Sequence, residues 1–360
     1  MNKLTHFFNR HDAAVALALV IMAITIGTGL GWENNKIVPV NPAPTAHYTL
    51  EPHNRLSILS NWDGPIYLNI ADHGYETAGQ ANFFPLYPLA IHLVHVVISS
   101  ILDSALVVSW LAFFIATLFY LKIMKQLYGN HGGLEAARGT ILFVFFPTAV
   151  FLFATYTEAL FACFALGSLY FALRQRYVLC AIMALLCTAT HVTGLFVLVL
   201  IGLVLLESGT RLWRAALTTA AGALGFIFYL IYQQVRFHNI FAFIDAQKKH
   251  NWFDLNPTHF FSALASLNGL FIILLVIAAI YWWQKRKSFA IYSFLYACII
   301  FVGGKDLGGV GRYSLMAFPL QFMLYEYFRN KKVAYPLVIT LCAILWTFYT
   351  LRYIGGYTGG

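Results

Sequence analysis

Long apolar runs recur through almost the whole of this 360-residue chain. A helix needs about 20 apolar residues to cross a bilayer, so the shorter runs must tilt, kink or pack as pairs. Only 10% of the residues are charged, whereas soluble domains carry about 25%. The pattern predicts an all-α polytopic membrane protein, a single domain over residues 1–360 with about 11–12 transmembrane helices. The runs lie at roughly 13–31, 84–101, 104–121, 139–155, 158–173, 177–190, 192–206, 215–232, 264–283, 289–302, 313–328 and 333–350.

The basic residues lie in small groups between these runs. Successive groups are separated by two runs, so all of them share one side of the membrane, which the positive-inside rule assigns to the cytoplasm. The net charge of +9 therefore indicates orientation, and nucleic-acid binding is not expected. The five groups are Lys122, Lys125 and Arg138; Arg174 and Arg176; Arg211 and Arg214; Lys285, Arg286 and Lys287; and Arg329, Lys331 and Lys332.

The first apolar run follows a basic N-terminus and has no small-residue cleavage site after it, which predicts an uncleaved span with the N-terminus in the cytoplasm. Three runs then separate the N-terminus from Lys122, where an even number is required. We expect residues 84–101, which begin with two prolines, to form an interfacial or re-entrant segment. The expected location is the plasma or inner membrane of the cell.

This topology places every polar cluster that could do chemistry on the extracytoplasmic side. The expected outer segments are a long first loop at residues 33–83, carrying short interfacial helices, and further loops at 233–263 and 303–312. Two short turns, at Glu158 and at His191, belong to the same side. The first loop contains Asp63, which can cap a helix that has Pro65 in its first turn and ends at Gly74. Asp63 is therefore either a cap or a functional carboxylate.

Five further residues are candidates because of their charge and position. An ionisable group at the membrane is costly and by default functional, but Glu158 could simply favour the dipole of the helix that follows it. His191 could likewise be an ordinary helix-terminal residue. Arg236 lies in one predicted outer loop, and Lys305 and Arg312 lie in another, which contains five glycines. Basic residues outside the membrane suggest phosphate binding, although either loop could be an ordinary solvated one.

Asp63, Asp72 and Glu76 could hold a divalent metal, but their spacing is loose. No cofactor and no metal are therefore predicted, although a divalent metal stays possible. Trp62, Tyr67 and Tyr75 could stack on a ligand or shape a cleft.

Ordered motifs along the chain resemble the PIG-V family of mannosyltransferases and its prokaryotic relatives. The most specific block is Trp62-Asp63-x-x-x-Tyr67-Leu68-x-Ile70-Ala71-x-x-Gly74-Tyr75, followed by Phe83-Phe84-Pro85-Leu86-Tyr87-Pro88. The supporting blocks are Phe146-Pro147-Thr148-Ala149, Tyr156-Thr157-Glu158-Ala159-Leu160-Phe161, Thr190-His191-Val192-Thr193-Gly194-Leu195, Phe241-Ala242-Phe243 with Ala246-Gln247, and Gly311-Arg312-Tyr313 with Ala317-Phe318-Pro319.

The resemblance implies a membrane glycosyltransferase of the GT-C class. It implies transfer of a sugar, typically mannose, from a polyprenyl-phosphate donor to an extracytoplasmic lipid or glycan acceptor. It also implies that Asp63, in the first outer loop, is the catalytic base. This chain has His191 where family members often carry Arg, so a fixed charge at that position is not expected.

From these elements we expect Arg312, with Lys305 or Arg236, to bind the donor phosphate. The residues expected to bind or orient the substrates are Trp62, Tyr67, Asp72, His73, Tyr75, Glu158 and His191. Two other classes of protein are alternatives. A flippase for a lipid-linked sugar should show inverted repeats, which the sequence lacks. In a non-catalytic subunit of an assembly complex, Asp63 would be dispensable.

Overall fold

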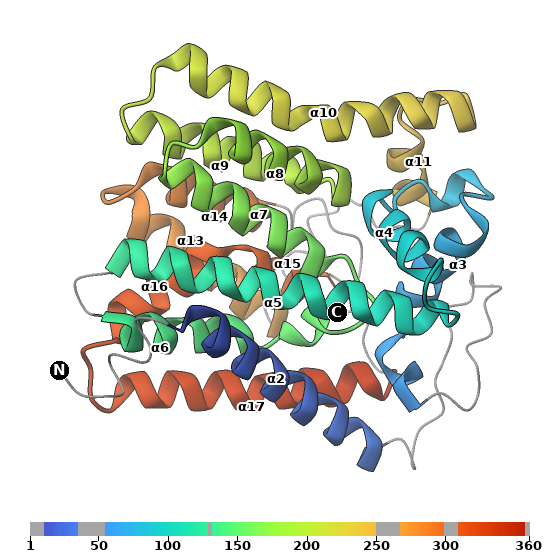
Figure 1. The fold of residues 1–360 in the computed structure, drawn as a ribbon. Coiled ribbons are helices and arrows are strands. Elements are labelled where there is room, and N and C mark those ends of the chain that lie inside the picture. Colours follow the sequence, from blue (N-terminus) through green and yellow to red (C-terminus); the bar gives the residue numbers. More distant parts are fainter. Residues whose placement is uncertain (1–10, 35–54, 129–131, 250–266, 299–308, 357–360) are drawn as a thin grey trace.

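The computed structural model describes residues 11–34, 55–128, 132–249, 267–298 and 309–356, and within these ranges it contains helices and loops but no strand. Four of the described helices are long and apolar enough to cross a membrane. They are α2 (Asp12–Asn34), α5 (Ile101–Tyr128), α10 (Leu212–Phe237) and α17 (Ala334–Ile354). Shorter helices run between them: α7 (Glu158–Leu173), α8 (Tyr177–Thr190), α9 (Gly194–Glu207), α13 (Leu267–Trp283) and α14 (Lys287–Cys298). Figure 1 shows α10 along one edge of the bundle and α2 with α17 along the other.

The predicted all-α polytopic membrane fold is confirmed. The five basic connections lie together at one end of the bundle, on the left in Figure 1. Ion pairs join elements at that end, including Lys125 with Asp12, and Lys285 with Glu326 at 2.6 Å. Which side of a membrane this end faces stays a prediction.

The opposite end carries the short elements of the first loop and the short helix that follows it. These are η1 (Arg55–Leu59), α3 (Gly64–His73), η2 (Ala78–Gln80) and α4 (Leu86–His95), with α11 (Ala242–Lys249) beside them. Helix α4 is ten residues long, which corresponds to about 15 Å at 1.5 Å per residue and is half of a bilayer core. It does not span, and this accounts for the odd count of apolar runs before Lys122.

Prolines divide two predicted apolar runs. The run at 139–155 is α6 (Gly132–Val144), which ends shortly before Pro147, followed by the single turn η4 (Ala149–Leu152). The run at 313–328 is two helices, α15 (Val310–Met316) and α16 (Phe318–Phe328), which meet at Ala317. Proline lacks an N–H and disfavours helical geometry in the residue before it, so a helix restarts there instead of continuing.

Three predicted loop boundaries are wrong. Helix α2 extends to Asn34, past the start at residue 33 expected for the first loop, and α15 begins at Val310, inside the loop expected at 303–312. The outer loop expected to begin at residue 233 begins after Phe237, because α10 continues for five more residues. Residues 233–237 remain helical. The side-chain oxygen of Gln233, which is fully buried, accepts a hydrogen bond from the backbone N–H of Phe243 at 2.8 Å.

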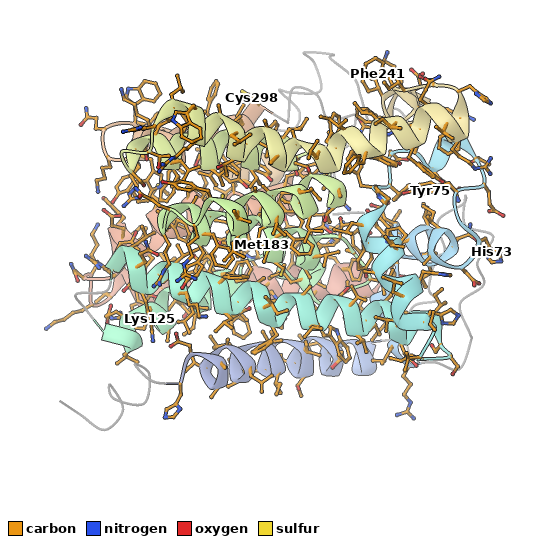
Figure 2. All side chains as sticks on the ribbon, turned by 45° about the horizontal axis from the view of Figure 1, so that its top comes forward. His73, Tyr75, Lys125, Met183, Phe241 and Cys298 are labelled. Carbon is orange, nitrogen blue, oxygen red and sulfur yellow. The ribbon has the colours of Figure 1, made fainter. Side chains whose placement is uncertain are left out.

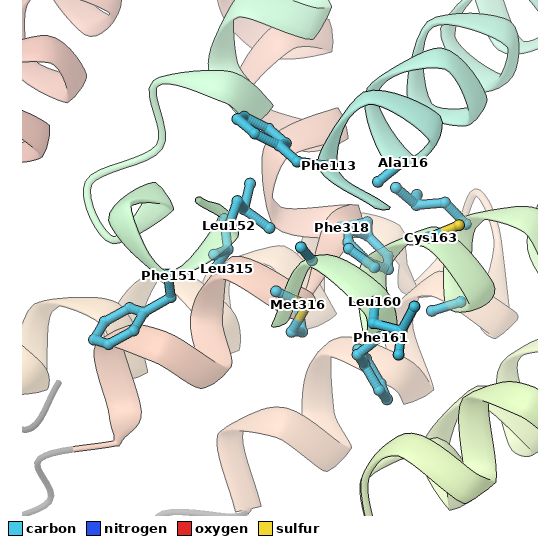
Figure 3. Packing of buried hydrophobic residues seen from close by; sticks show 14 of the residues in the cluster. Phe113, Ala116, Phe151, Leu152, Leu160, Phe161, Cys163, Leu315, Met316 and Phe318 are labelled. Atoms are coloured by element: carbon cyan, nitrogen blue, oxygen red, sulfur yellow. The ribbon is translucent and has the colours of Figure 1, made fainter. Parts of the chain in front are cut away.

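The core that supports the outer end lies between α5, α7, η4 and the α15–α16 pair, as Figure 3 shows. Helix α7 is apolar on all sides and is buried along most of its length, as expected for a helix surrounded by protein. Gly167 allows its close packing, because a Cβ there would come within 3.1 Å of Phe119 on α5 and 3.2 Å of Met183 on α8.

Candidate active site

Two carboxylates and one guanidinium meet at the outer end of the bundle. Arg312 Nη1 donates to Asp63 Oδ2 at 2.8 Å, and Arg312 Nε lies 3.1 Å from Glu158 Oε1. The side chains are 14%, 22% and 6% exposed for Arg312, Asp63 and Glu158. The Nε–Glu158 contact is an ion pair without hydrogen-bond geometry, since Nε has no hydrogen-bond partner among the described residues. Three residues from segments far apart in the sequence thus form one charged cluster.

Asp63 reaches this cluster because of how α3 begins. The helix has Pro65 in its first turn and ends at Gly74, which has a positive φ of 78°, both as predicted. Asp63 occupies the N-cap position, but its carboxylate makes no capping hydrogen bond. Of the two predicted roles for this carboxylate, capping is therefore not observed, and the side chain is turned toward Arg312.

Arg312 is placed by the short helix α15. The carbonyl of Gly311 accepts hydrogen bonds from the Thr148 hydroxyl at 2.8 Å and the Ser314 hydroxyl at 2.6 Å. These contacts fix the peptide that precedes Arg312 against η4. Burial lowers the pKa of Arg312, but Glu158 and Asp63 outweigh burial and raise the pKa well above its usual value. Arg312 is therefore a permanent cation.

Aromatic rings surround the guanidinium. Its carbon lies 5.4 Å from the ring centroid of Tyr156, 5.6 Å from that of Tyr313 and 5.8 Å from that of Phe151. Tyr156 is fully buried, and burial followed by the charge of Asp63 raises the pKa of its phenol. Its hydroxyl stays protonated and accepts a hydrogen bond from the backbone N–H of Asp63 at 3.2 Å.

His191 lies in the turn between α8 and α9, with its ring 5.9 Å from that of Tyr313. Its Nδ1 accepts a hydrogen bond from the backbone N–H of Thr193 at 3.2 Å and lies 2.8 Å from the Thr193 hydroxyl. This assigns the proton of the neutral ring to Nε2. Burial, and then the charge of Arg312, lower the pKa of His191 to about 3. A neutral side chain thus replaces the Arg often found in the family, in agreement with the expectation of no fixed charge.

Trp62 precedes Asp63 with a φ of 58°, a left-handed conformation that is uncommon outside glycine. Its indole N–H is buried and has no hydrogen-bond partner among the described residues. Strained backbone of this kind is often found at functional sites. Tyr67, one helical turn after Asp63, is 5% exposed and packs edge-on against Phe83 and Tyr87 at 5.0 and 5.2 Å. Of the two roles predicted for Tyr67, shaping the site fits better than stacking on a ligand.

The structure does not bring the other candidates to the cluster. Asp72 and His73 are exposed at the far end of α3, about 13 Å from Asp63 at 1.5 Å per residue, and Figure 2 shows His73 at the outer edge of the molecule. Arg236 on α10 donates to the carbonyl of Tyr75 at 3.0 Å. The Tyr75 hydroxyl donates to a backbone carbonyl in turn. Arg236 therefore ties α10 to the turn after α3, and Tyr75 ties that turn to Phe83.

Lys305 lies outside the described residues. Among the described side chains there is no group of three or more His, Cys, Asp and Glu that could hold a metal ion. The absence of a cofactor stays a prediction.

Sequence reasoning assigned no role to Tyr156, Tyr313 or Asn61. Tyr313 adjoins Arg312 and Tyr156 lies two residues before Glu158 in the quoted motifs, and this proximity was a usable signal. Asn61 adjoins Trp62, but its buried contacts with α17 are separated by more than 290 residues and have no local signature.

Comparison with known proteins adds two kinds of similarity. Residues 50–208 match the family model described as Mannosyltransferase (PIG-V). GPI alpha-1,6-mannosyltransferase 2 of Homo sapiens is 32% identical over 132 residues, or 34% of this chain and 27% of that protein. GPI mannosyltransferase 2 of Drosophila pseudoobscura pseudoobscura is 28% identical over 118 residues, or 30% of this chain and 25% of that protein. The predicted resemblance to the PIG-V family is confirmed.

The matched segment spans about a quarter of the length of these two relatives. The family-model match over residues 50–208 contains Asp63, Glu158 and His191, while Arg312 lies beyond it. The fold comparison covers more of the chain. ArnT from Cupriavidus metallidurans, in a crystal structure bound to undecaprenyl phosphate, superposes with a TM-score of 0.54 over 94% of this chain and 74% of that one, at 12% identity. The predicted GT-C-like fold is confirmed, and the two comparisons together support a membrane glycosyltransferase.

Proposed function

We propose that this protein transfers a hexose, mannose in the first instance, from a polyprenyl-phosphate donor to a hydroxyl of a lipid or glycan acceptor outside the cytoplasm. The observation that carries the proposal is the Asp63–Arg312–Glu158 cluster, at the end of the bundle opposite the basic connections. It lies in a PIG-V-like chain with a GT-C fold. The donor class is supported by the fold likeness to a protein solved with undecaprenyl phosphate and by the cation in the cluster.

The reaction needs a base for the proton of the acceptor hydroxyl and a cation for the charge of the leaving phosphate. Asp63 takes the proton of the acceptor hydroxyl as its oxygen attacks C1 of the sugar. The bond between C1 and the phosphate oxygen breaks, and its electron pair leaves with the prenyl phosphate. Attack opposite the leaving group inverts the configuration at C1. Arg312 stabilises the negative charge that develops on the phosphate.

Arg312 can bind phosphate while it remains paired. A guanidinium has five N–H donors, and the contacts with Asp63 and Glu158 engage Nη1 and Nε. The two carboxylates fix the plane of the guanidinium, and the rings of Tyr156 and Tyr313 limit its movement. The phosphate also competes with Asp63 for Arg312. Donor binding therefore weakens the ion pair and frees the Asp63 carboxylate to contact the acceptor hydroxyl.

Trp62 is the residue that we assign to the sugar. The indole N–H that lacks a partner can donate to a sugar hydroxyl, and Trp62 adjoins the base directly. His191 presents a neutral Nε2–H beside Tyr313, which suits a hydroxyl or a phosphate oxygen. Glu158 acts by orienting Arg312. The protein operates in the plasma or inner membrane, with its cluster on the outer side.

The test uses purified protein in proteoliposomes with radiolabelled polyprenyl-phosphate mannose, glucose or arabinose and a crude lipid acceptor extract. The proposal predicts label in a product that is no longer a polyprenyl phosphate, with mannose the best donor. Label that crosses the bilayer while still attached to its carrier would identify a flippase and contradict the proposal. Neither transfer nor transport would fit a non-catalytic subunit. Asp63→Asn in the same vesicles provides the matched control.

A further inference from the structure

The last turn of α17 is tied to the segment that leads into Asp63. The Tyr353 hydroxyl donates to the carbonyl of Leu59 at 3.1 Å and accepts from the backbone N–H of Asn61 at 3.1 Å. The Asn61 side-chain amide donates to the carbonyl of Tyr353 at 2.9 Å. Tyr353 and Asn61 are each 1% exposed. Helix α17 lies outside the residues that the family model matches.

The same tyrosine contacts the aromatic wall of the charged cluster. Its ring packs edge-on against Phe151 at 5.4 Å and Tyr156 at 5.8 Å between centroids. Phe151 in η4 and Tyr156 in the turn after it both lie against the guanidinium of Arg312. The Tyr156 hydroxyl also accepts a hydrogen bond from the backbone N–H of Asp63. Tyr353 therefore adjoins the supports of both the carboxylate and the guanidinium.

The segment is held from its other side as well. The backbone N–H of Thr155 donates to the carbonyl of Leu59 at 2.9 Å, and the Thr155 hydroxyl donates to that of Ser60 at 2.9 Å. Between these supports and α3, Trp62 adopts its left-handed conformation. A strained residue persists only where its surroundings fix it, and Tyr353 supplies three of the fixing hydrogen bonds through its hydroxyl and carbonyl.

We propose that Tyr353 is a positioning residue for the transfer reaction: it fixes the Leu59–Asp63 segment so that the Asp63 carboxylate lies against Arg312. The effect on the transfer rate rests on the proposed function. The effect on the position of the Leu59–Asp63 segment does not. Tyr353 touches no substrate. It acts through Asn61 and Tyr156, and small displacements of a reacting group are costly because catalysis depends on pre-set geometry.

Tyr353→Phe tests this, since it keeps the ring and removes the hydroxyl. The carbonyl of Leu59 keeps Thr155 as a donor, whereas the N–H of Asn61 loses its acceptor. Tyr335→Phe is a matched control from the other end of the same helix. Tyr335 is 3% exposed and donates to the carbonyl of Arg138 at 2.8 Å. Both variants lose one buried hydroxyl from α17.

Two measurements apply to both variants in the full-length protein. We expect Tyr353→Phe to lower kcat at least tenfold, on the order expected for a misplaced base, with the donor KM unchanged, while Tyr335→Phe stays near wild type at equal thermal stability. Equal kinetic effects in the two variants would overturn the inference. Amide hydrogen exchange of the peptide containing Asn61 should become at least about tenfold faster in Tyr353→Phe alone. Unchanged exchange would overturn the inference. A wild type that is inactive on every donor would refute only the proposed function, and the exchange measurement would still test the inference.

Discussion

Replacing Arg312 by Lys should reduce transfer strongly without removing the positive charge. The guanidinium reaches Asp63 through Nη1 at 2.8 Å and Glu158 through Nε at 3.1 Å, two contacts made by different atoms of one plane. A single ammonium cannot reproduce this arrangement and also meet a phosphate. Loss of one charge-assisted hydrogen bond costs about 1.5–3 kcal/mol. Because 1.36 kcal/mol corresponds to a factor of ten, kcat/KM should fall about 10- to 150-fold.

The assay measures initial rates of sugar transfer over a range of donor concentrations, with thermal stability measured on the same preparations. Arg138→Lys is the matched control, because Arg138 pairs with Glu135 at 2.6 Å and lies over the ring of Tyr335 at 4.6 Å, at the opposite end of the bundle. It should leave kcat/KM within about twofold. An Arg312→Lys variant with wild-type stability and a kcat/KM within twofold of wild type would refute the reasoning.

Three further predictions follow from the site. His191 has a pKa of about 3 when folded and 6.5 ordinarily, so the unfolded chain binds the extra proton and stability falls as the pH falls below 6.5. The free energy of unfolding should fall by about 2 kcal/mol between pH 7.5 and pH 5. Thermal melts at the two pH values should show that His191→Gln removes this loss, and an unchanged pH dependence would contradict the assignment of a neutral ring. Asp72→Asn and His73→Asn, which alter exposed residues, should change kcat/KM less than threefold in the transfer assay, and a loss on the scale of Arg312→Lys would place them at the site after all. In Gly64→Ala the new Cβ would lie 2.4 Å from the Thr155 hydroxyl, so the start of α3 must shift; activity and thermal stability should both fall, and wild-type values for both would show that the turn adapts.

The sequence predicted the architecture well where one physical signal dominated. Apolar runs and basic connections are repeated many times along the chain, so single errors did not alter the bundle or its two ends. The odd count of runs also led to the short segment now seen as α4. Pro147 and Pro319 could have predicted the divided runs, because the rule for proline is local.

The candidate site was predictable only in part. Asp63, Glu158 and Arg312 stand out because charges are rare in this chain, and the structure brings these three together. Asp72 and His73 were chosen for their proximity to Asp63 in sequence, but a ten-residue helix carries them away from it.

Arg236 was chosen for its charge, and in the structure its guanidinium donates to the carbonyl of Tyr75. Contacts such as that of Tyr353 with Asn61 depend on how the ends of helices far apart in sequence meet. No motif or periodicity encodes that.

The central claim is that Asp63 is the base that accepts the proton from the acceptor hydroxyl. The most direct measurement is the transfer rate of purified Asp63→Asn from polyprenyl-phosphate mannose, at wild-type expression and thermal stability. Asn keeps the size of the side chain but cannot take the proton, so the rate should fall by about 10²- to 10⁴-fold. A variant that retains full transfer activity would contradict the account.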